Sequence, residues 1–197
     1  MKIQDFEKIV SVSPSAVILL EGRRGISEAE ALAARDFGEF LARRFPALRF
    51  RSGNAEGADQ AFSDGVAKVD ARRLQIVAPY ASHRKKNRNP AVVYSSPDDL
   101  SPEQVEEFIK KTAAASPKIG RLLNRWKDGG ALAVKATYLL RDSMKVLGHS
   151  EEFPKPICGI FFTDPSDPMA GGTGHTIRVC QQESVPVLFQ TDWLKWM

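Results

Sequence analysis

The stretch Ala16-Val17-Ile18-Leu19-Leu20-Glu21-Gly22-Arg23-Arg24-Gly25 decides the fold of this chain. Its first five residues form a short apolar run rich in β-formers that stops at a glycine-rich turn, so the pattern predicts a buried strand. Ser27 and Glu30 follow with the spacing of a capping box, and apolar residues then recur at helical spacing to about Arg44. A buried strand leading through a glycine turn into a helix is typical of an α/β domain.

The same alternation continues along the chain. Further strands are predicted at residues 48–51, 74–78, 157–162 and 185–189, and further helices at residues 57–68, 131–147 and from about 175 to 182. Strands that alternate with helices indicate a largely parallel sheet with helices on both faces. We therefore expect a single Rossmann-like α/β domain over residues 1–197.

The segment 84–130 differs in character, because it is polar and punctuated by prolines. Within it, Ser101 and Pro102 have the pattern of an N-cap followed by proline at the first helical position. We interpret the segment as a mainly helical insertion within the single domain.

Composition restricts the class of protein. Hydrophobic residues make up 43% of the 197 and charged residues 26%, as in globular domains, and no apolar run reaches the roughly 18 residues that span a membrane. The first residues, Met1–Glu7, lack the apolar core of a signal peptide. Cys158 and Cys180 lie in apolar segments and are expected to be buried free thiols. Together these features predict a cytoplasmic protein without a membrane partner, and we expect no metal site and no bound cofactor.

Three glycine-rich turns each follow a predicted strand and precede a predicted helix, at residues 22–25, 53–57 and 171–174. Right-handed crossovers place the ends of parallel strands at one edge of the sheet. Ligands of open α/β sheets bind beyond these carboxyl ends. The convergence of the three turns therefore predicts a binding site there, which no single motif would establish.

The third turn is the most specific. Its glycines would allow positive φ and a close backbone approach, and the helix after it would offer unpaired N–H groups and a positive dipole end to a phosphate. Threonine hydroxyls would add donors, and the histidine would be a ligand contact or an acid/base group; the alternative is a plain strand–helix turn. The predicted ligand-binding residues here are Gly171, Gly172, Thr173, Gly174, His175 and Thr176.

The other two turns complete the predicted site. From the first, Gly22 and Arg23 are expected to contact a phosphate, since an arginine beside a flexible strand end can fork onto it. The predicted residues of the second turn are Ser52, Gly53, Gly57 and Asp59. Asp59 would accept a ribose hydroxyl or a base amine, or it would only cap its helix. If the protein is an enzyme, Glu56 and Asp59 are the candidate catalytic carboxylates.

Two of these motifs together resemble the SLOG superfamily, which includes the DprA/Smf, YpsA-like and LOG phosphoribohydrolase proteins. Ser52-Gly53-x-Ala55-x-Gly57-x-Asp59 matches the S-G-x-A-x-G-x-D motif of DprA-like members, and Gly171 through Thr176 match G-G-x-G-(H/T)-T. Arg141-Asp142-Ser143-Met144 is similar to the Arg-Asn-x-x-Met helix of the YpsA-like branch, which the chain resembles most closely. The resemblance implies a Rossmann-like fold, a ligand at the glycine turns and Arg141 among the ligand-binding residues. SLOG-like proteins often pair, so a homodimer is a further expectation.

One departure from the LOG pattern concerns activity. Aligned on the glycines, Arg178 stands where LOG enzymes carry the catalytic glutamate of P-G-G-x-G-T-x-x-E, and Ala170 replaces the proline. Whether the protein is an enzyme therefore stays open. The leading hypothesis is binding of a nucleotide or nucleotide-derived phosphate ligand, as a sensor or carrier.

Two alternatives remain. The first is hydrolysis of a nucleotide N-glycosidic (phosphoribosyl) bond. The second is DprA-like binding of single-stranded nucleic acid through the basic segment His83–Arg88 between Tyr80 and Tyr94. The net charge of only +4 favours weak or no nucleic-acid binding. The apolar C-terminus, residues 193–197, is either a subunit interface or the edge of the core.

Overall fold

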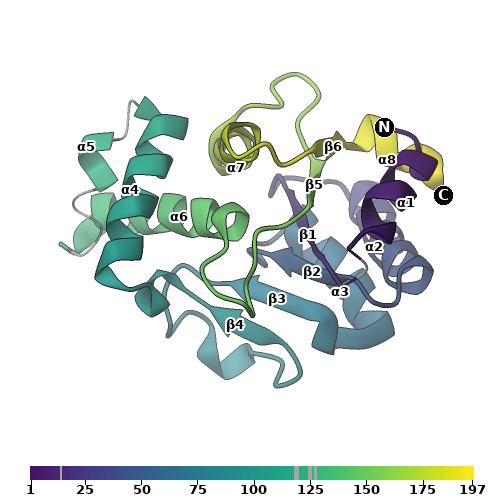
Figure 1. Ribbon diagram of the computed structural model, residues 1–197, viewed down its shortest axis with the longest axis horizontal. Helices are drawn as coiled ribbons and strands as arrows, with labels where there is room; N and C mark the ends of the chain where they lie inside the picture. Colours follow the sequence, from purple (N-terminus) through teal and green to yellow (C-terminus); the bar gives the residue numbers. More distant parts are fainter. Residues whose placement is uncertain (14, 118–119, 124–125, 127) are drawn as a thin grey trace.

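A computed structural model describes residues 1–13, 15–117, 120–123, 126 and 128–197 (Figure 1). Strands are β1 (Val17–Gly22), β2 (Arg49–Ser52), β3 (Leu74–Val77), β4 (Val93–Ser95), β5 (Cys158–Phe162) and β6 (Val187–Phe189). Helices are α1 (Ile3–Ser11), α2 (Glu28–Arg44), α3 (Ala58–Asp70), α4 (Pro102–Ala115), α5 (Gly120–Leu123), α6 (Gly130–Leu147), α7 (Gly171–Gln182) and α8 (Gln190–Trp193). Within the described ranges, no helix is long and apolar enough to cross a membrane.

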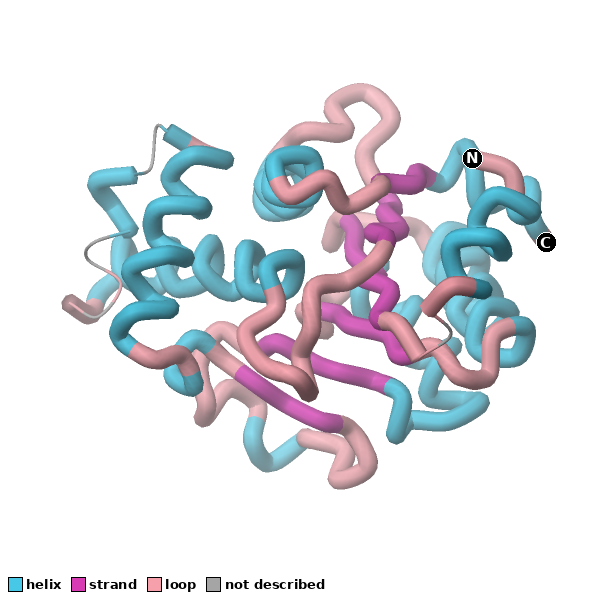
Figure 2. Tube along the Cα trace, viewed as in Figure 1, coloured by secondary structure: helices cyan, strands magenta, loops and turns pink. Residues whose placement is uncertain are grey.

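The six strands form one parallel sheet in the order β4-β3-β2-β1-β5-β6, which confirms the predicted Rossmann-like fold (Figure 2). The chain moves outward from β1 to β4 on one side and then returns to place β5 on the other side of β1. The strand order therefore reverses between β1 and β5. In open parallel sheets such a switch point leaves a crevice at the carboxyl ends of the two strands.

Both faces of the sheet are covered, because side chains of β1 alternate between two cores. Ile18 and Leu20 join the cluster that contains Phe37 of α2 and Phe62 of α3. Leu19 faces the opposite way, into a cluster with residues of α6 and α7. Helices α4–α7 accordingly lie on one side of the sheet, and α1–α3 and α8 on the other (Figure 1).

Several local predictions are confirmed. Ser27 and Glu30 form a reciprocal capping box at the start of α2, and Ser101 caps α4 with Pro102 as its first residue. Cys158 and Cys180 are buried free thiols. The predicted insertion does contain helices, α4 and α5.

The structure differs from the sequence prediction in the segment 84–130. Val93–Ser95 pair in parallel with β3 and form the edge strand β4, so part of this segment belongs to the sheet. Only three residues pair, which is too short to give a recognisable alternation of apolar and polar residues. The segment as a separate insertion stays a prediction.

The start of α7 also differs. The helix begins at Gly171 rather than near His175, so the motif Gly171–Thr176 forms its first turns instead of a loop. Only Gly171 of the three glycines has a positive φ, at 59°. The prediction that the glycines as a group adopt positive φ is therefore wrong, because Gly172 and Gly174 are helical.

The two termini form the edge of the core. Trp193 is fully buried, and its indole N–H donates to the Phe161 carbonyl over 3.1 Å. Trp196 packs on Phe6 of α1, with ring centroids 5.2 Å apart. Of the two interpretations of the C-terminal aromatic residues, the core edge is the one observed for both tryptophans.

Candidate functional site

A cavity of about 1030 Å³ opens at the carboxyl edge of the sheet, beside the switch point. Its walls come from the turn after β1, from Asp59 of α3, from α6 and from the first half of α7. Residues 115–117 at the end of α4 close one side, and Asp164 after β5 contributes on another. Turns far apart in sequence therefore meet at one site, as their positions after parallel strands require.

The predicted ligand-binding residues fall into two groups. The described residues that line the cavity include Gly22, Arg23, Asp59, Arg141, Gly171, Gly172, Thr173 and His175. Those outside its lining are Ser52, Gly53, Gly57, Gly174 and Thr176. Glu56 also lies outside the lining: its side chain is 76% exposed and pairs with Arg84 over 3.1 Å. Glu56 is therefore placed away from the other predicted catalytic carboxylate, Asp59.

The amino end of α7 faces the cavity. Ala170 is the N-cap and has no side chain that caps the helix, so the first-turn N–H groups lack acceptors within the helix. Gly171, Gly172 and Thr173 carry these groups and line the cavity. Gly174 allows the preceding loop to pack closely, because a Cβ there would lie 1.7 Å from the Met169 carbonyl oxygen. The first turn thus presents its donors, together with the positive end of the helix dipole, to the cavity.

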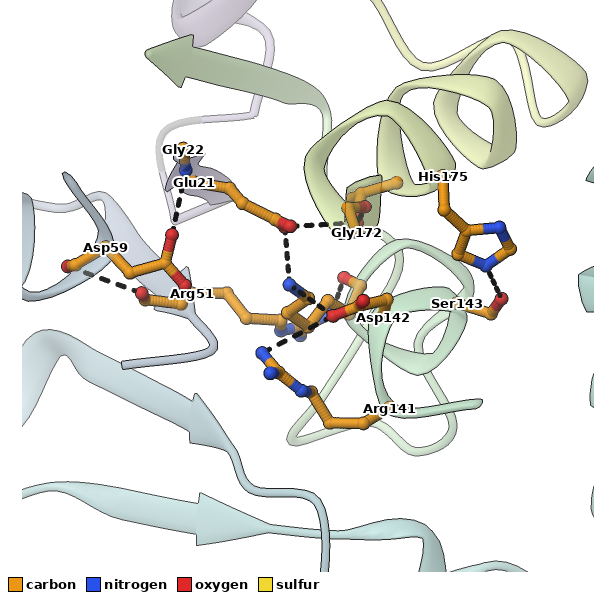
Figure 3. Close-up of polar contacts among 12 residues, drawn as sticks. Glu21, Gly22, Arg51, Asp59, Arg141, Asp142, Ser143, Gly172 and His175 are labelled. Atoms are coloured by element: carbon orange, nitrogen blue, oxygen red, sulfur yellow. Dashed lines mark hydrogen bonds and ion pairs between the residues drawn. The ribbon is translucent and has the colours of Figure 1, made fainter. Parts of the chain in front are cut away.

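A buried ionic cluster forms part of the cavity wall: Glu21, Asp59, Arg141 and Asp142 line the cavity (Figure 3). Lys145 is its fifth member. The Lys145 Nζ lies 2.5 Å from the Glu21 Oε2 and 2.9 Å from the Asp142 Oδ1. The Arg141 Nη1 lies 3.4 Å from the same Asp142 oxygen. All five side chains are at least nine-tenths buried, so each charge depends on its neighbours rather than on water.

Asp59 connects the first and second glycine turns. Its Oδ1 accepts a hydrogen bond from the Gly22 N–H at 2.8 Å, while the N-cap position of α3 is Gly57, which makes no side-chain cap. The alternative that Asp59 only caps α3 is therefore not what the structure shows. Gly53 is required nearby because a Cβ on it would lie 1.6 Å from the Arg141 Nη1. The second turn thus makes room for the Arg141 guanidinium.

Burial and the neighbouring charges give the buried carboxyl groups different pKa values. Burial raises the pKa of Glu21 to about 8 despite the charge of Lys145, and burial also raises the pKa of Asp59. For Asp142, burial acts in the same direction, but Lys145 and Arg141 outweigh it and lower the pKa. The pKa values of Glu21 and Asp142 are therefore shifted in opposite directions.

This difference predicts a pH effect on stability. The pKa of Glu21 in the folded protein, about 8, lies above its ordinary value of 4.5, so folding favours the protonated form. The stability that Glu21 contributes at low pH should be lost as pH rises from about 4.5 to 8, with a slope of up to about 1.4 kcal/mol per pH unit. Urea unfolding of the wild type and Glu21→Gln across this range measures the difference. Parallel profiles of the two proteins would contradict the assignment.

Arg141 retains hydrogen-bonding capacity toward the cavity. Its Nε is buried and has no partner among the described residues. Its guanidinium stacks near the Tyr138 ring at 5.4 Å, and Asp142 is its ion-pair partner within the described ranges. A buried guanidinium whose donors are incompletely used is suited to bind an anion that enters the cavity.

Sequence reasoning named His175 but missed its contacts with Ser116 and Ser143. His175 lies between two serines: its Nδ1 is 2.8 Å from the Ser116 Oγ, and its Nε2 is 3.1 Å from the Ser143 Oγ. Arg178 donates to the carbonyls of Ala115 and Met169 and so ties the end of α4 to the loop before α7. The position that carries a catalytic glutamate in LOG enzymes thus holds a structural contact here. A polar run within the otherwise apolar α6, residues 141–145, was the available signal for the buried cluster.

Two arginines of the basic segment after β3 are engaged in contacts, while Lys85 and Lys86 are exposed. Arg84 pairs with Glu56, and the Arg88 guanidinium covers the Tyr94 ring at 4.5 Å. Tyr80 remains 42% exposed and contacts His83 edge-on. Among the described residues of this segment, few aromatic faces are therefore open to stacking by bases.

Comparison with known proteins found matches among solved structures. No family model and no curated protein sequence matches the chain. Two solved structures are similar. DNA processing protein A from Helicobacter pylori, which has a single-stranded DNA binding mode, has a TM-score of 0.47 and 12% identity over 92% of this chain and 67% of that chain. The molybdenum cofactor carrier protein MCP from Chlamydomonas reinhardtii has a TM-score of 0.39 and 11% identity over 90% of each chain.

Proposed function

We propose that the protein binds a nucleotide or nucleotide-derived phosphate ligand in the cavity, as a sensor or carrier. The observation that carries this proposal is the meeting of two sets of incompletely used donors in one cavity. These are the first-turn N–H groups of α7 and the buried guanidinium of Arg141. A phosphate at the amino end of α7 would accept from the N–H groups and gain from the helix dipole.

The charges around the cavity support an anionic ligand. Its basic side chains among the described residues are Arg23, Arg24, Lys135, Arg141 and Arg178, and its acidic ones are Glu21, Asp59, Asp142 and Asp164. Five basic side chains face four acidic ones, and the raised pKa of Glu21 shifts the balance further toward positive charge. A net positive cavity raises the affinity and the association rate of a phosphate-bearing molecule.

The size of the cavity supports a ligand larger than phosphate. A volume of about 1030 Å³ is at the upper end of the range for small-molecule sites, so it has room for a sugar and a base beyond the phosphate. The motif resemblance to the SLOG superfamily points the same way, and we propose this family for the chain. A homodimer and a cytoplasmic location remain part of this proposal.

Hydrolysis of an N-glycosidic bond is a second candidate, favoured by the buried carboxyl groups. Glu21 and Asp59 line the cavity, and Glu21 carries a raised pKa, as general acids in glycoside cleavage do. Glu56 is exposed and lies outside the cavity lining. We therefore propose Glu21 with Asp59 as the pair of carboxyl groups to test. Nucleic-acid binding is expected to be weak or absent, because the net charge is only +4 and the basic segment has few aromatic side chains.

A panel of nucleoside monophosphates, nucleotide sugars and ribose 5-phosphate tests the proposed function. Ligand at about 100 times its dissociation constant should stabilise the fold by roughly 2.7 kcal/mol, which raises the melting temperature by several degrees. The same mixtures should be analysed for free base, whose release by the wild type but not by Glu21→Gln or Asp59→Asn would establish the hydrolase. If no compound shifts the melting temperature at millimolar concentration, the proposed function is wrong.

A further inference from the structure

A chain of hydroxyl groups runs through His175 into the protein. Thr112 donates to the Phe108 carbonyl over 2.6 Å, and its Oγ1 lies 2.7 Å from the Ser143 Oγ. The Ser143 Oγ contacts the His175 Nε2 at 3.1 Å, and the His175 Nδ1 contacts the Ser116 Oγ at 2.8 Å. Figure 3 shows His175 and Ser143 turned toward each other. Ser116 is the end of this chain that lines the cavity.

The chain has one direction of donation. A carbonyl only accepts, so the single proton of the Thr112 hydroxyl is used by Phe108. The Thr112 hydroxyl has one proton for its two contacts, with Phe108 and Ser143; with that proton assigned to the Phe108 carbonyl, Ser143 donates to Thr112 and its oxygen accepts from the Nε2–H of His175. The Leu139 carbonyl also acts on this imidazole as a hydrogen-bond acceptor. The neutral ring therefore carries its proton on Nε2, and its Nδ1 accepts from Ser116.

The imidazole stays neutral at physiological pH. Burial lowers the pKa of His175 to about 4, although the nearby Asp142 acts in the opposite direction. With one ring proton only, the tautomer is set by the groups around it. The Ser116 hydroxyl thus has its proton committed to His175.

This arrangement leaves Ser116 as an acceptor toward a ligand. The Ser116 Oγ accepts one hydrogen bond from the Arg178 Nη2–H at 3.3 Å, which uses one of its two lone pairs. The other is available to a donor in the cavity. Pro117, Ala115 and Leu139 are apolar residues that also line the cavity. A flat apolar group with one outward N–H donor matches these neighbours.

The distance from the phosphate site suits a nucleoside. Ser116 contacts His175 and Arg178, which follow Gly171 by four and seven residues along α7. At a rise of about 1.5 Å per residue, these side chains lie roughly 6–10 Å along the helix from its amino end. A ligand with its phosphate at Gly171–Thr173 would therefore bring its base, rather than its sugar, to Ser116.

We propose that Ser116 recognises the exocyclic amino group of a nucleobase, so that the cavity selects amino-bearing bases over their oxo counterparts. This inference rests on the proposed function. An adenine amino group would donate to the Ser116 oxygen. The carbonyl of hypoxanthine, at the same ring position, would place two acceptors face to face and leave both without a donor.

Calorimetric titration of AMP, IMP and ribose 5-phosphate tests the inference. The wild type should bind AMP roughly 10- to 100-fold more tightly than IMP, the range expected when a buried polar group loses its partner. Ser116→Ala should bring the two within about threefold of each other while the affinity for ribose 5-phosphate stays unchanged. Ser82→Ala, a serine outside the described cavity lining, is the matched control and should keep the wild-type preference.

The outcomes separate the two proposals. Equal binding of AMP and IMP by the wild type, or a preference for IMP, overturns the role of Ser116 but leaves phosphate binding intact. Binding of none of the three compounds overturns both. The ring tautomer can be read independently of any ligand or variant from the ¹⁵N shifts of His175, where a proton on Nε2 is expected. A proton on Nδ1 would overturn the inference even if Ser116→Ala failed to fold.

Discussion

Replacing Lys145 with methionine should lower the free energy of unfolding by about 3–5 kcal/mol at pH 7. The Lys145 side chain is fully buried, and its Nζ contacts both Glu21 and Asp142. Its removal leaves the ionised Asp142 with Arg141 at 3.4 Å as its remaining cationic partner among the described residues. The Lys145 side chain is itself fully buried, so its removal takes away a cation from carboxyl groups that are at least nine-tenths buried. Denaturant unfolding monitored by circular dichroism measures the loss.

A matched control and a second substitution test whether the stability loss in Lys145→Met comes from the uncompensated charge of Asp142. Lys135→Met on the same helix removes an exposed ammonium group and should change stability by less than about 0.5 kcal/mol. Adding Asp142→Asn to Lys145→Met removes the uncompensated charge and should restore more than about 1 kcal/mol. A Lys145→Met variant as stable as the wild type would show that the buried ionic cluster does not stabilise the fold.

Arg51 fixes the backbone of Lys145 and so helps to hold its side chain beside the carboxyl groups. Its guanidinium is fully buried, donates to the Lys145 carbonyl over 3.0 Å and bonds twice to Gln75 of β3. Burial lowers the pKa of Arg51 to about 9. The carboxyl end of α6 is thereby fixed against the sheet, and the negative end of its dipole faces a cation.

The parts of the fold that the sequence predicts well are those set by local patterns. The apolar run at residues 16–20 and the capping box at Ser27 are each complete within a few residues, so strand β1 and helix α2 follow from them. The meeting of the glycine turns at one edge follows from the handedness of crossovers and needs no knowledge of packing. The edge strand β4 was missed because its pairing depends on β3 rather than on its own sequence.

The buried cluster is different, because it joins residues that no local pattern links. Glu21 and Lys145 are 124 positions apart, and a lysine three residues after Asp142 normally indicates a solvent-exposed face of a helix. The Ser116–His175 contact likewise depends on how the end of α4 packs on α7. The polar run at residues 141–145 was a signal for Asp142 and Lys145, but the pairing of Lys145 with Glu21 and the role of Ser116 were identifiable only after the helices were placed on the sheet.

The second large effect concerns the ligand: Gly172→Val should weaken binding of a phosphate ligand by roughly 100-fold or more, the value of about two charge-assisted hydrogen bonds. Gly172 lies in α7 without a positive φ, so its backbone tolerates a side chain, but a Cβ there would lie 3.1 Å from the Asp142 Oδ2 and this carboxylate would have to shift by a few tenths of an ångström. The branched side chain would cover the first-turn N–H groups that face the cavity.

Gly25→Val is the matched control, since a Cβ at this cavity-lining glycine meets nothing within 4 Å. Its affinity should stay within about threefold of the wild type if the phosphate binds at α7. The melting temperatures of both variants are measured first, and each is then titrated with AMP in a calorimeter. The two affinities show whether the phosphate binds at the amino end of α7 or at the turn after β1. A folded Gly172→Val protein with wild-type affinity would exclude the amino end of α7 as the phosphate site, and loss of affinity in Gly25→Val alone would transfer that role to the turn after β1.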